Sequence, residues 1–482
     1  MIALFRDQPR SFFMIFMLEI WERFGFYTVQ GLLVLYFIRF LGFNETDAYY
    51  TFGAFSALVY GLVILGGYLG DNVLGTKRTL FLGLIVLAAG YLDLALVDKQ
   101  GAFFALSLIC VGNGLFKANP SSLLSKSYAS NDPRLYSGFT LYYMAINFGA
   151  IVALFVGPAL SSHYGYSYAY LASFIGIVLG LVNYIYQRKQ LDPIDTPFDQ
   201  HEIVPWQWAL ILLGIFFLSK CATYLLYHVT LAQNLLWLIT ACALLIYFFL
   251  MSRENLAEKK RMLLALILMV EAVAFFTLYQ QFPMSLTLFA VNHIRPEVFS
   301  ISIDPQSFRV LNGIWIVAMS PVLAKFYVYL NQRGIHFPVP YKFALGMAFC
   351  GVGFALLFFC RYLYDAQYMI SLGWLVAAYF FESMGELFVS ALGVAMIAEL
   401  VPQKIVGFVM GLWFLTSAVA GFTGAMVSSY TALPTQINPG FDSLMMYSRV
   451  FGWIGLVTLL VALFLGLLSK RLTRLMGAVT CL

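Results

Sequence analysis

Long apolar runs separated by short polar breaks fill almost the whole chain. About 20 residues of helix span a hydrocarbon core that is about 30 Å thick. Counted on this basis, the runs predict fourteen transmembrane helices, near 12–39, 50–70, 79–97, 102–124, 137–160, 167–186, 207–227, 232–251, 262–290, 308–329, 342–360, 370–400, 405–430 and 448–469. The pattern therefore predicts an all-α polytopic membrane protein. Because the number of spans is even, both termini are expected on the same side.

The composition agrees with a membrane protein. Hydrophobic residues make up 61% of the chain, charged residues only 11%, and the mean hydropathy is +0.84, whereas a soluble domain has about 25% charged residues. No basic run is long enough to form a phosphate-binding face, so nucleic acid is not an expected partner. The six cysteines show no CxxC spacing, and we expect neither a disulfide framework nor a metal site. The lipid bilayer is the expected surrounding.

Basic residues are distributed unevenly between the two sets of loops. Most lie on the side of the termini, among them Lys77, Arg78 and Lys259. The opposite side and its helix ends hold only Arg39, Lys99, Lys220, Arg295, Arg309, Arg361 and Arg449. Because cytoplasmic loops carry the excess of lysine and arginine, both termini are predicted to be cytoplasmic.

Two charged linkers divide the predicted helices into groups of six, two and six. The first reads "QRKQLDPIDTPFDQHE" (187–202) and the second "SRENLAEKKR" (252–261). Two six-helix halves with an inserted hairpin are typical of secondary transporters. We therefore expect an N-terminal bundle at 1–190, a linker and two-helix insert at 191–258, and a C-terminal bundle at 259–482.

The first predicted helix carries three charges within five residues, in "MLEIWERFGFYTVQ" (17–30). A charge at mid-bilayer costs about 2.5–3.5 kcal/mol on insertion scales. At about 100° per residue the polar and aromatic positions share one arc of the helix, comprising Glu19, Glu22, Arg23, Phe26, Tyr27 and Gln30. An internal Glu19–Arg23 ion pair at i,i+4 spacing is the structural alternative. It leaves Glu22 unexplained, so this face is predicted to line a polar cavity.

Other polar residues also fall inside predicted helices. Lys117 lies near the middle of the fourth span, in "GNGLFKANPSS" (112–122), where Pro120 permits a bend. Glu382 and Glu386 are i,i+4 neighbours in "FESMGELFVSALG" (381–393), and adjacent carboxylates suit a site that takes up a proton. Asn147 and Asn312 add neutral hydrogen-bonding groups. Glu271 is a secondary candidate for protonation, and a structural role is equally open for it. All five histidines fall in predicted loops or at helix ends, so a histidine proton relay is not expected and carboxylates must carry any proton coupling.

These motifs resemble the proton-dependent oligopeptide transporters, whose first-helix motif reads ExxERFxYY. The motif stands here as Glu19-Ile-Trp-Glu22-Arg23-Phe24-Gly25-Phe26-Tyr27, with Phe26 in place of the first tyrosine. Further segments follow in order, among them "FGAFSALVYGLVILGGYLGD", "GNGLFKANPSSLL", "YYMAINFGA", "SMGELFVSALG" and "GLWFL". The chain looks most similar to the bacterial di- and tripeptide permeases of this family, which also have a two-helix insert.

The resemblance implies the major facilitator fold and the import of small peptides with protons. A peptide binder that accepts any side chain must bind the carboxylate, the ammonium group and the backbone. By resemblance, Arg23 and Lys117 bind the carboxylate, Glu386 the ammonium, and Asn147 and Asn312 the backbone, across a central crevice. The further substrate-binding residues that it implies are Tyr27, Tyr60, Gln280, Ser390 and Trp413. The proton-coupling residues that we expect are Glu19, Glu22, Arg23 and Glu386.

Two departures from the family pattern carry consequences. Many members have an arginine at the position of Gln30 and an acid near Gln280, which form a gating ion pair. Both positions are glutamine here, so the outer gate is expected to close by hydrogen bonding and packing. The segment "SALG" (390–393) also lacks the proline that commonly follows this serine.

The sequence thus predicts a proton-coupled symporter of di- and tripeptides, with peptidomimetics as further substrates. Protons are the expected coupling ion, and no cofactor is expected. We expect a monomer in the bacterial inner membrane. A major facilitator carrier for another small solute is the alternative. A channel would need a repeated pore ring, and an enzyme would need a nucleophile–base or metal constellation inside the helices, so neither is predicted.

Overall fold

The computed structural model describes residues 7–129, 132, 134–194, 196–200, 202–298, 301–334, 337–390, 393–434 and 440–475. His201, His336 and residues 391–392 of the "SALG" segment lie outside this part of the chain. Fourteen helical segments of the described chain are long and apolar enough to cross a membrane, which confirms the predicted number. The described chain falls into two compact units, residues 1–43 with 54–232 and residues 44–53 with 233–482. The boundaries expected from the two linkers stay predictions.

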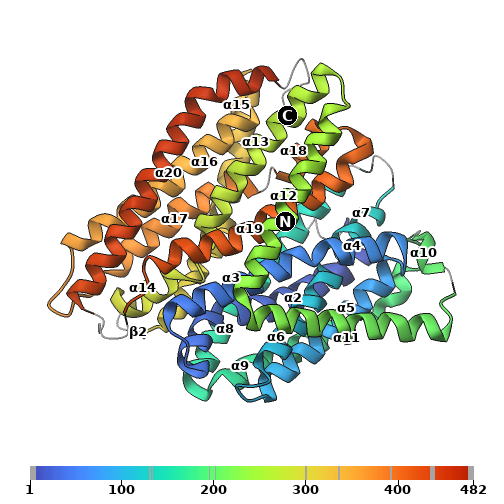
Figure 1. The fold of residues 1–482 in the computed structure, drawn as a ribbon, viewed down its shortest axis with the longest axis horizontal. Helices are drawn as coiled ribbons and strands as arrows, with labels where there is room; N and C mark the ends of the chain where they lie inside the picture. Colours follow the sequence, from blue (N-terminus) through green and yellow to red (C-terminus); the bar gives the residue numbers. More distant parts are fainter. Residues whose placement is uncertain are drawn as a thin grey trace. The chain divides into compact units, whose positions relative to one another are not determined.

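The first unit is built from helices that follow one another closely along the chain (Figure 1). They are α2 (Arg10–Leu35) with a π-helical end (Tyr36–Leu41), α3 (Glu45–Gly61), α4 (Val63–Asn72), α5 (Thr76–Leu96), α6 (Ala102–Lys117), α7 (Asn119–Lys126), α8 (Arg134–Tyr164), α9 (Tyr166–Gln187) with a 3-10 turn (Arg188–Leu191), α10 (Pro197–Gln200) and α11 (Pro205–Tyr227). The first residues of α3 belong to the second unit. A single residue, Gly165 with φ of 98°, separates α8 from α9, and this left-handed backbone favours glycine.

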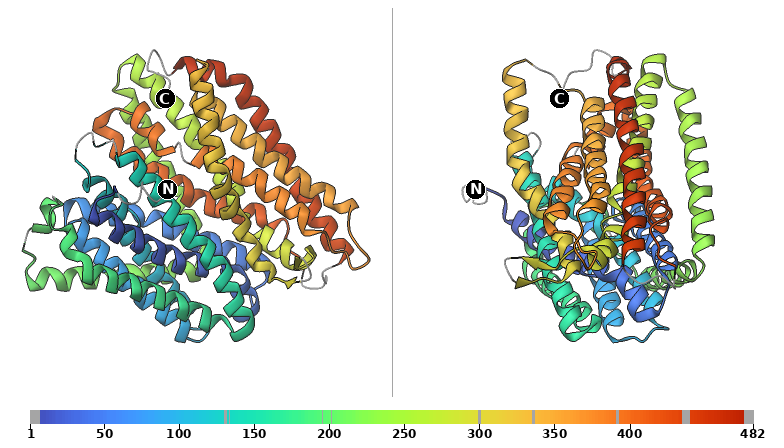
Figure 2. Two further views of the ribbon diagram at one scale, coloured as in Figure 1. Left: turned by 180° about the vertical axis from the view of Figure 1, so that it is seen from behind. Right: turned by 90° about the vertical axis from the view of Figure 1, so that its left-hand side faces the viewer.

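The second unit begins with the other insert helix. Its elements are α12 (Val229–Ser252), α13 (Leu256–Tyr279), α14 (Ser285–His293), the strands β1 (Glu297–Val298) and β2 (Ile301–Ser302), a 3-10 turn (Pro305–Arg309), α15 (Val310–Gln332), α16 (Val339–Phe359) with a 3-10 turn (Cys360–Tyr362), α17 (Leu372–Val389), α18 (Gly393–Leu400), a 3-10 turn (Gln403–Ile405), α19 (Val406–Ser429) and α20 (Phe441–Leu475). The two short strands pair antiparallel. Within this unit α16 lies along α20 and α17 in each view (Figure 2).

Two predicted spans end well before their predicted limits in the structure. The helix predicted over 262–290 ends at Tyr279, and α14 starts only at Ser285. Pro283 lacks a backbone donor and cannot bond the Tyr279 carbonyl one turn earlier. Separately, the Gln281 side chain donates to the carbonyl groups of Thr277 and Gly424, at 3.0 and 3.1 Å. The helix predicted over 370–400 is likewise divided into α17 and α18. Single long helices were therefore the wrong prediction at these two places.

The bend that Pro120 predicts is confirmed as a break between α6 and α7 at Ala118. Proline cannot donate to the carbonyl one turn earlier, which is that of Phe116. The break makes Lys117 the last residue of α6. A sequence position in the middle of a span thus becomes a helix end.

Close helix contacts fix the position of the charged part of α2. Helix α8 packs along α2 within the first unit. A Cβ on Gly149 of α8 would lie 2.6 Å from the Ile20 carbonyl oxygen and 2.9 Å from the Arg23 Cβ. Small residues let membrane helices approach in this way, so Gly149 brings α8 against the turn of α2 that carries the charges.

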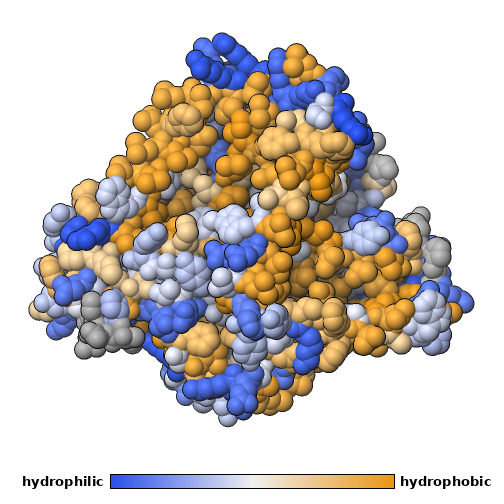
Figure 3. Space-filling view, in the orientation of Figure 1, coloured by the Kyte–Doolittle hydropathy of each residue, from blue (hydrophilic) through white to orange (hydrophobic). Residues whose placement is uncertain are grey.

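The outer surface of several helices is strongly apolar, as a membrane surface requires. Hydrophobic side chains gather over the outer face of α20 (Figure 3), where Trp453, Leu460 and Leu467 are exposed. The insert helix α12 is the least buried span of the described chain, and α11 is as little buried as the span Pro305–Leu330. Apolar residues of α11, among them Trp208 and Ile215, pack against the cluster formed by Leu82 and Val111 of the first unit.

His293 links three segments of the second unit. Its Nε2 lies 2.8 Å from the Ser443 hydroxyl at the start of α20, and its Nδ1 lies 3.2 Å from the Tyr368 carbonyl oxygen. Burial lowers the pKa of His293 below its ordinary value of 6.5. The neutral ring is therefore the form that the fold favours.

We expect acidification to destabilise the second unit where His293 contacts Ser443 and Tyr368. A base whose pKa is lowered by folding contributes its stability fully above its unfolded pKa of 6.5 and loses it as the pH falls through the folded value. The melting temperature of the wild type should consequently fall more between pH 7 and pH 5 than that of His293→Gln. Equal pH slopes for the two proteins would contradict this role of His293.

Candidate functional site

The charged cluster of the first unit is built on one face of α2. Glu19, Glu22 and Arg23 are 1%, 0% and 5% exposed. Arg23 Nε donates a 2.8 Å hydrogen bond to Glu19 Oε1, and Tyr142 of α8 donates one of 2.7 Å to Glu19 Oε2. Glu19 is thus fixed from two sides, and the ion pair weighed as a structural alternative is present.

Glu22 is held differently. One carboxylate oxygen lies 2.9 Å from Arg23 Nε, but neither oxygen has a hydrogen-bond partner among the described residues. The single Nε–H is directed at Glu19, so Glu22 interacts with Arg23 by charge alone. A fully buried carboxylate without hydrogen bonds is costly, and the Glu19–Arg23 ion pair does not account for it.

The two terminal nitrogens of the Arg23 guanidinium form no hydrogen bond with a described residue. Arg23 hydrogen-bonds only through Nε within the described part of the chain, while its two terminal nitrogens carry four further N–H donors. These donors form the planar fork that binds a carboxylate in a bidentate manner. The guanidinium carbon lies 5.8 Å from the centroid of the Phe26 ring, which helps to fix its plane.

Lys117 reaches the same cluster from the end of α6. Its ammonium nitrogen lies 3.9 Å from the centroid of the Tyr60 ring and 5.5 Å from that of Phe26, and it forms no salt bridge to a described carboxylate. Aromatic faces stabilise a cation at such distances. Lys117 is therefore held in place by aromatic rings, and its charge is not neutralised by a direct ion pair with a described carboxylate.

The remaining first-unit candidates lie nearby. Tyr27 is half-buried on α2, one turn after Arg23. Asn147 is buried on α8, where its amide nitrogen donates to the Tyr143 carbonyl at 2.9 Å and its side-chain oxygen remains as an acceptor. Gln30 is buried on the same helix as Arg23. Lys117 and Tyr60 thus join the Arg23 face of α2, whereas contacts of Asn147 and Gln30 with this cluster stay predictions.

A second cluster lies wholly within the second unit and centres on Glu386. Asn312 of α15 donates to Glu386 Oε2 at 2.9 Å and to the Ser383 hydroxyl at 3.1 Å. The buried Arg309, one turn before Asn312, acts on Glu386 by charge. Glu386 is thereby oriented by an amide and a nearby cation.

Glu382 does not share this arrangement. Its carboxylate lies against Cys350 and beside Gly353 of α16, whereas Glu386 faces α15. The two acids are neighbours along α17 but have different partners. Proton uptake by these neighbouring carboxylates, which their spacing suggests, stays a prediction.

The other second-unit candidates are placed individually. Trp413 of α19 is buried and contacts the Phe276 ring edge-on, with centroids 5.9 Å apart. Gln280 is buried directly after α13, and Ser390 follows α17. Glu271 is buried on α13, and neither of its oxygens is hydrogen-bonded to a described residue. Glu271 stays a secondary candidate.

Three residues of these clusters escaped the sequence reasoning. Tyr142 binds Glu19, Ser383 binds Asn312, and Arg309 acts on Glu386. Arg309 and Ser383 each lie three residues before a predicted site residue, so an i,i+3 search on a helix face would have found them. Tyr142 lies on another helix, and no spacing rule connects it to Glu19.

Two bundles of membrane-spanning helices, each with a buried polar cluster, define a secondary transporter of the major facilitator fold. Residues 77–449 match the model of the POT family, and the chain belongs to this family. It is a multi-pass protein of the inner membrane. The family and fold predicted from the sequence are confirmed.

Curated relatives cover nearly the whole chain. Dipeptide and tripeptide permease B of Xenorhabdus bovienii is 43% identical over 98% of this chain and 97% of its own length. The permease B of Salmonella typhimurium is 44% identical over 98% of this chain and 97% of its own length. The permease A of Pectobacterium carotovorum is 42% identical over 97% of this chain and 92% of its own length.

Solved structures agree in fold. A bacterial homologue of the human drug peptide transporters PepT1 and PepT2 is 31% identical, with a TM-score of 0.86 over 97% of this chain and 99% of that one. A peptide transporter POT in complex with alafosfalin is 28% identical, with a TM-score of 0.82 over 98% of this chain and 96% of that one.

Proposed function

We propose that the chain imports di- and tripeptides together with protons by alternating access. One observation carries the proposal: the Arg23 guanidinium and the Lys117 ammonium are both positioned, yet keep donors that no described carboxylate occupies. The names of the curated relatives support the substrate class. Peptide passes without chemical change, so we assign no catalytic reaction and no cofactor, and protons are the coupling ion.

A di- or tripeptide is a zwitterion, and the two clusters have complementary charges. The Arg23 fork and Lys117 would bind the carboxylate, because a charge-assisted bidentate bond is stronger than a neutral one. Glu386, oriented by Asn312, would bind the ammonium group. Asn147 would accept from a peptide N–H, and Tyr27, Tyr60, Gln280, Ser390 and Trp413 would contact the remainder.

Proton coupling follows from the sharing of Arg23. Ionised Glu22 competes with a substrate carboxylate for the guanidinium, and protonated Glu22 does not. Proton binding and peptide binding then favour each other reciprocally. Glu19, with its two hydrogen bonds, orients Arg23 in this scheme.

A carrier for another small solute is the second candidate function. Uptake of labelled dialanine into proteoliposomes under an imposed pH gradient separates the two. Accumulation that requires the gradient and is competed by unlabelled tripeptide supports the proposal. Absence of peptide uptake in active, correctly inserted protein would favour the alternative.

Glu386 should distinguish peptides by their N-terminus. We expect Glu386→Gln to weaken a zwitterionic dipeptide by about tenfold or more, because a charge-assisted hydrogen bond contributes about 1.5–3 kcal/mol. A dipeptide with a blocked N-terminus should lose much less. Competition of both ligands against labelled dialanine measures the ratio.

Glu382→Gln is the matched control, since Glu382 lies one turn away on α17 and faces α16. It should affect both ligands alike. Equal losses of the two ligands in Glu386→Gln would assign Glu386 to structure or to proton transfer alone.

We also propose that both termini are cytoplasmic, because most basic loop residues lie on their side. We propose a monomer, because each polar cluster is built from residues of one chain. One related transporter of known structure is described as tetrameric. Mass measurement of the detergent-solubilised chain tests the monomer directly.

A further inference from the structure

Two apolar grooves flank α20 within the second unit. The first has a volume of about 630 Å³ and is lined by α13, α19 and α20, with Leu278, Val427 and Val457 among its residues. The second, of about 410 Å³, lies between α16 and α20 and includes Phe358 and Leu459. Both volumes lie in the range of small-molecule sites. Each groove can therefore hold a flexible apolar chain.

Arg449 and Trp453 line both grooves. They are one turn apart on α20, so they form a ridge with a groove on each side. The Arg449 side chain is exposed and has no hydrogen bond or ion pair with another described residue. The ridge thus presents one uncompensated cation between two apolar depressions.

A second cation stands at the same end of the second groove. Arg361 contacts the Met445 sulfur at 3.4 Å, and its guanidinium carbon lies 5.2 Å from the centroid of the Phe358 ring. Met445 precedes Arg449 by one turn of α20. The nearest acid along this helix, Asp442, is two turns from Arg449, about 10.5 Å along the axis. The local charge is consequently positive.

The grooves have the length of one membrane leaflet. From Arg449 the first reaches Val461 and the second Leu459, which is about 18 and 15 Å along a helix. Half of a hydrocarbon core of about 30 Å is about 15 Å. Tyr430 and Trp453, 65% and 62% exposed, also line the first groove, and such aromatic residues mark the membrane interface.

We propose that α20 binds one anionic diacyl phospholipid of the phosphatidylglycerol class. Its phosphate binds Arg449 with Arg361 beside it, and one acyl chain enters each groove. A single charge joined to two apolar chains matches one cation between two grooves. A second copy of this chain is the other possible occupant of the ridge, and the oligomeric mass measured in the test below separates it from a lipid. The site shares no residue with either polar cluster and adds a lipid ligand to the proposed transport function.

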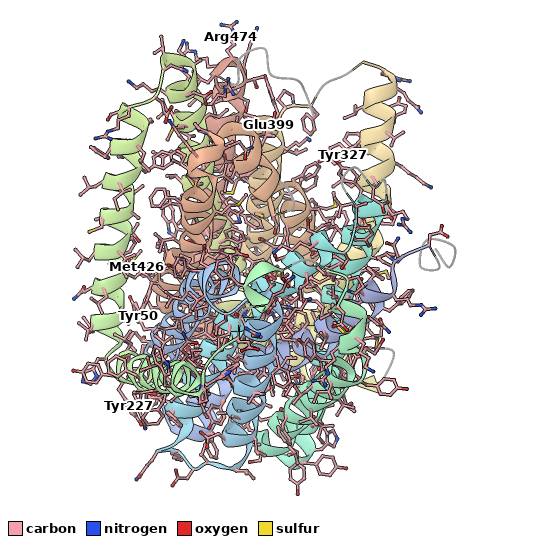
Figure 4. All side chains as sticks on the ribbon, turned by 90° about the vertical axis from the view of Figure 1, so that its right-hand side faces the viewer. Tyr50, Tyr227, Tyr327, Glu399, Met426 and Arg474 are labelled. Atoms are coloured by element: carbon pink, nitrogen blue, oxygen red, sulfur yellow. The ribbon has the colours of Figure 1, made fainter. Side chains whose placement is uncertain are left out.

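Native mass spectrometry of the full-length chain tests the headgroup. The wild type should bind one phosphatidylglycerol about fivefold more tightly than phosphatidylcholine, because a basic residue near the surface contributes about that factor with an anionic lipid. Arg449→Gln should abolish this preference. Arg474→Gln is the matched control, since Arg474 lies on the same helix but at the end of the unit remote from Met426, the neighbour of Val427 (Figure 4).

The acyl chains have their own test. Val457→Trp fills the first groove and should weaken diacyl phosphatidylglycerol while leaving the single-chain lyso form, which needs only one groove, unaffected. Melting temperatures without lipid verify that each variant is folded. The proposal is overturned if the wild type binds the two headgroups equally, or if Arg474→Gln loses as much preference as Arg449→Gln. It is also overturned if Arg449→Gln or Val457→Trp changes the oligomeric mass, since a second copy would then occupy the ridge.

Discussion

Lys117→Ala should abolish concentrative peptide uptake. The variant removes one of two cations that we assign to the peptide carboxylate, and a hydrogen bond to a charged group contributes about 1.5–3 kcal/mol. The expected loss is at least about tenfold in apparent affinity, and larger where the site excludes water. Uptake of labelled dialanine at matched expression measures it.

Lys220→Ala is a control of the same kind. Lys220 of α11 also lies over an aromatic ring, 4.2 Å from the centroid of Phe104, but it is exposed and outside the first-unit cluster. Both variants lose a cation–π contact, whereas only one loses a substrate ligand. Near-normal uptake by Lys117→Ala, or an equal defect in Lys220→Ala, would show that Lys117 serves the fold alone.

Glu22→Gln should separate transport from accumulation. Glutamine has the shape of the protonated acid and carries no charge to compete with a substrate carboxylate for Arg23, so peptide should still bind and exchange across the membrane. The proton then no longer drives the cycle, and pH-driven accumulation should fall to the equilibrium level. Proteoliposomes loaded with unlabelled peptide measure counterflow, and a pH gradient measures accumulation.

Glu258→Gln controls for the loss of an ion-paired carboxylate. Glu258 lies 3.6 Å from Arg261 at the start of α13 and is remote in sequence from every predicted site residue. Both assays should be unchanged in this variant. Full pH-driven accumulation by Glu22→Gln would move the coupling role to Glu19, Glu271 or Glu386.

The sequence predicts the number of spans because a bilayer imposes length and apolar composition on each one. It fails where a helix is interrupted by tertiary contacts. The side chain of Gln281, two residues after the end of α13, bonds Gly424 far along the chain, and no periodicity records that contact. The break at Ala118, by contrast, depends on Pro120 alone and is predictable.

The candidate site also has features that the sequence predicts and features that it does not. The face of α2 that carries Glu19, Glu22 and Arg23 follows from helical spacing. Its hydrogen-bond pattern does not, because the choice of Arg23 Nε between two acids depends on Tyr142 of α8. The different surroundings of Glu382 and Glu386 are also invisible in their spacing. Sequence thus identifies the charged residues, and only tertiary structure identifies their partners.

The break at Ala118 has an electrostatic consequence for Lys117. The last carbonyl groups of a helix carry a partial negative charge, which stabilises a nearby cation by about 0.3–1 kcal/mol. In an unbroken span Lys117 would lie in the helix interior, but here it lies in the last turn of α6. Its ammonium group also lies over the Tyr60 ring and forms no salt bridge to a described carboxylate. Lys117 can therefore accept a carboxylate without first losing an ion pair, and Pro120 contributes to this by ending α6.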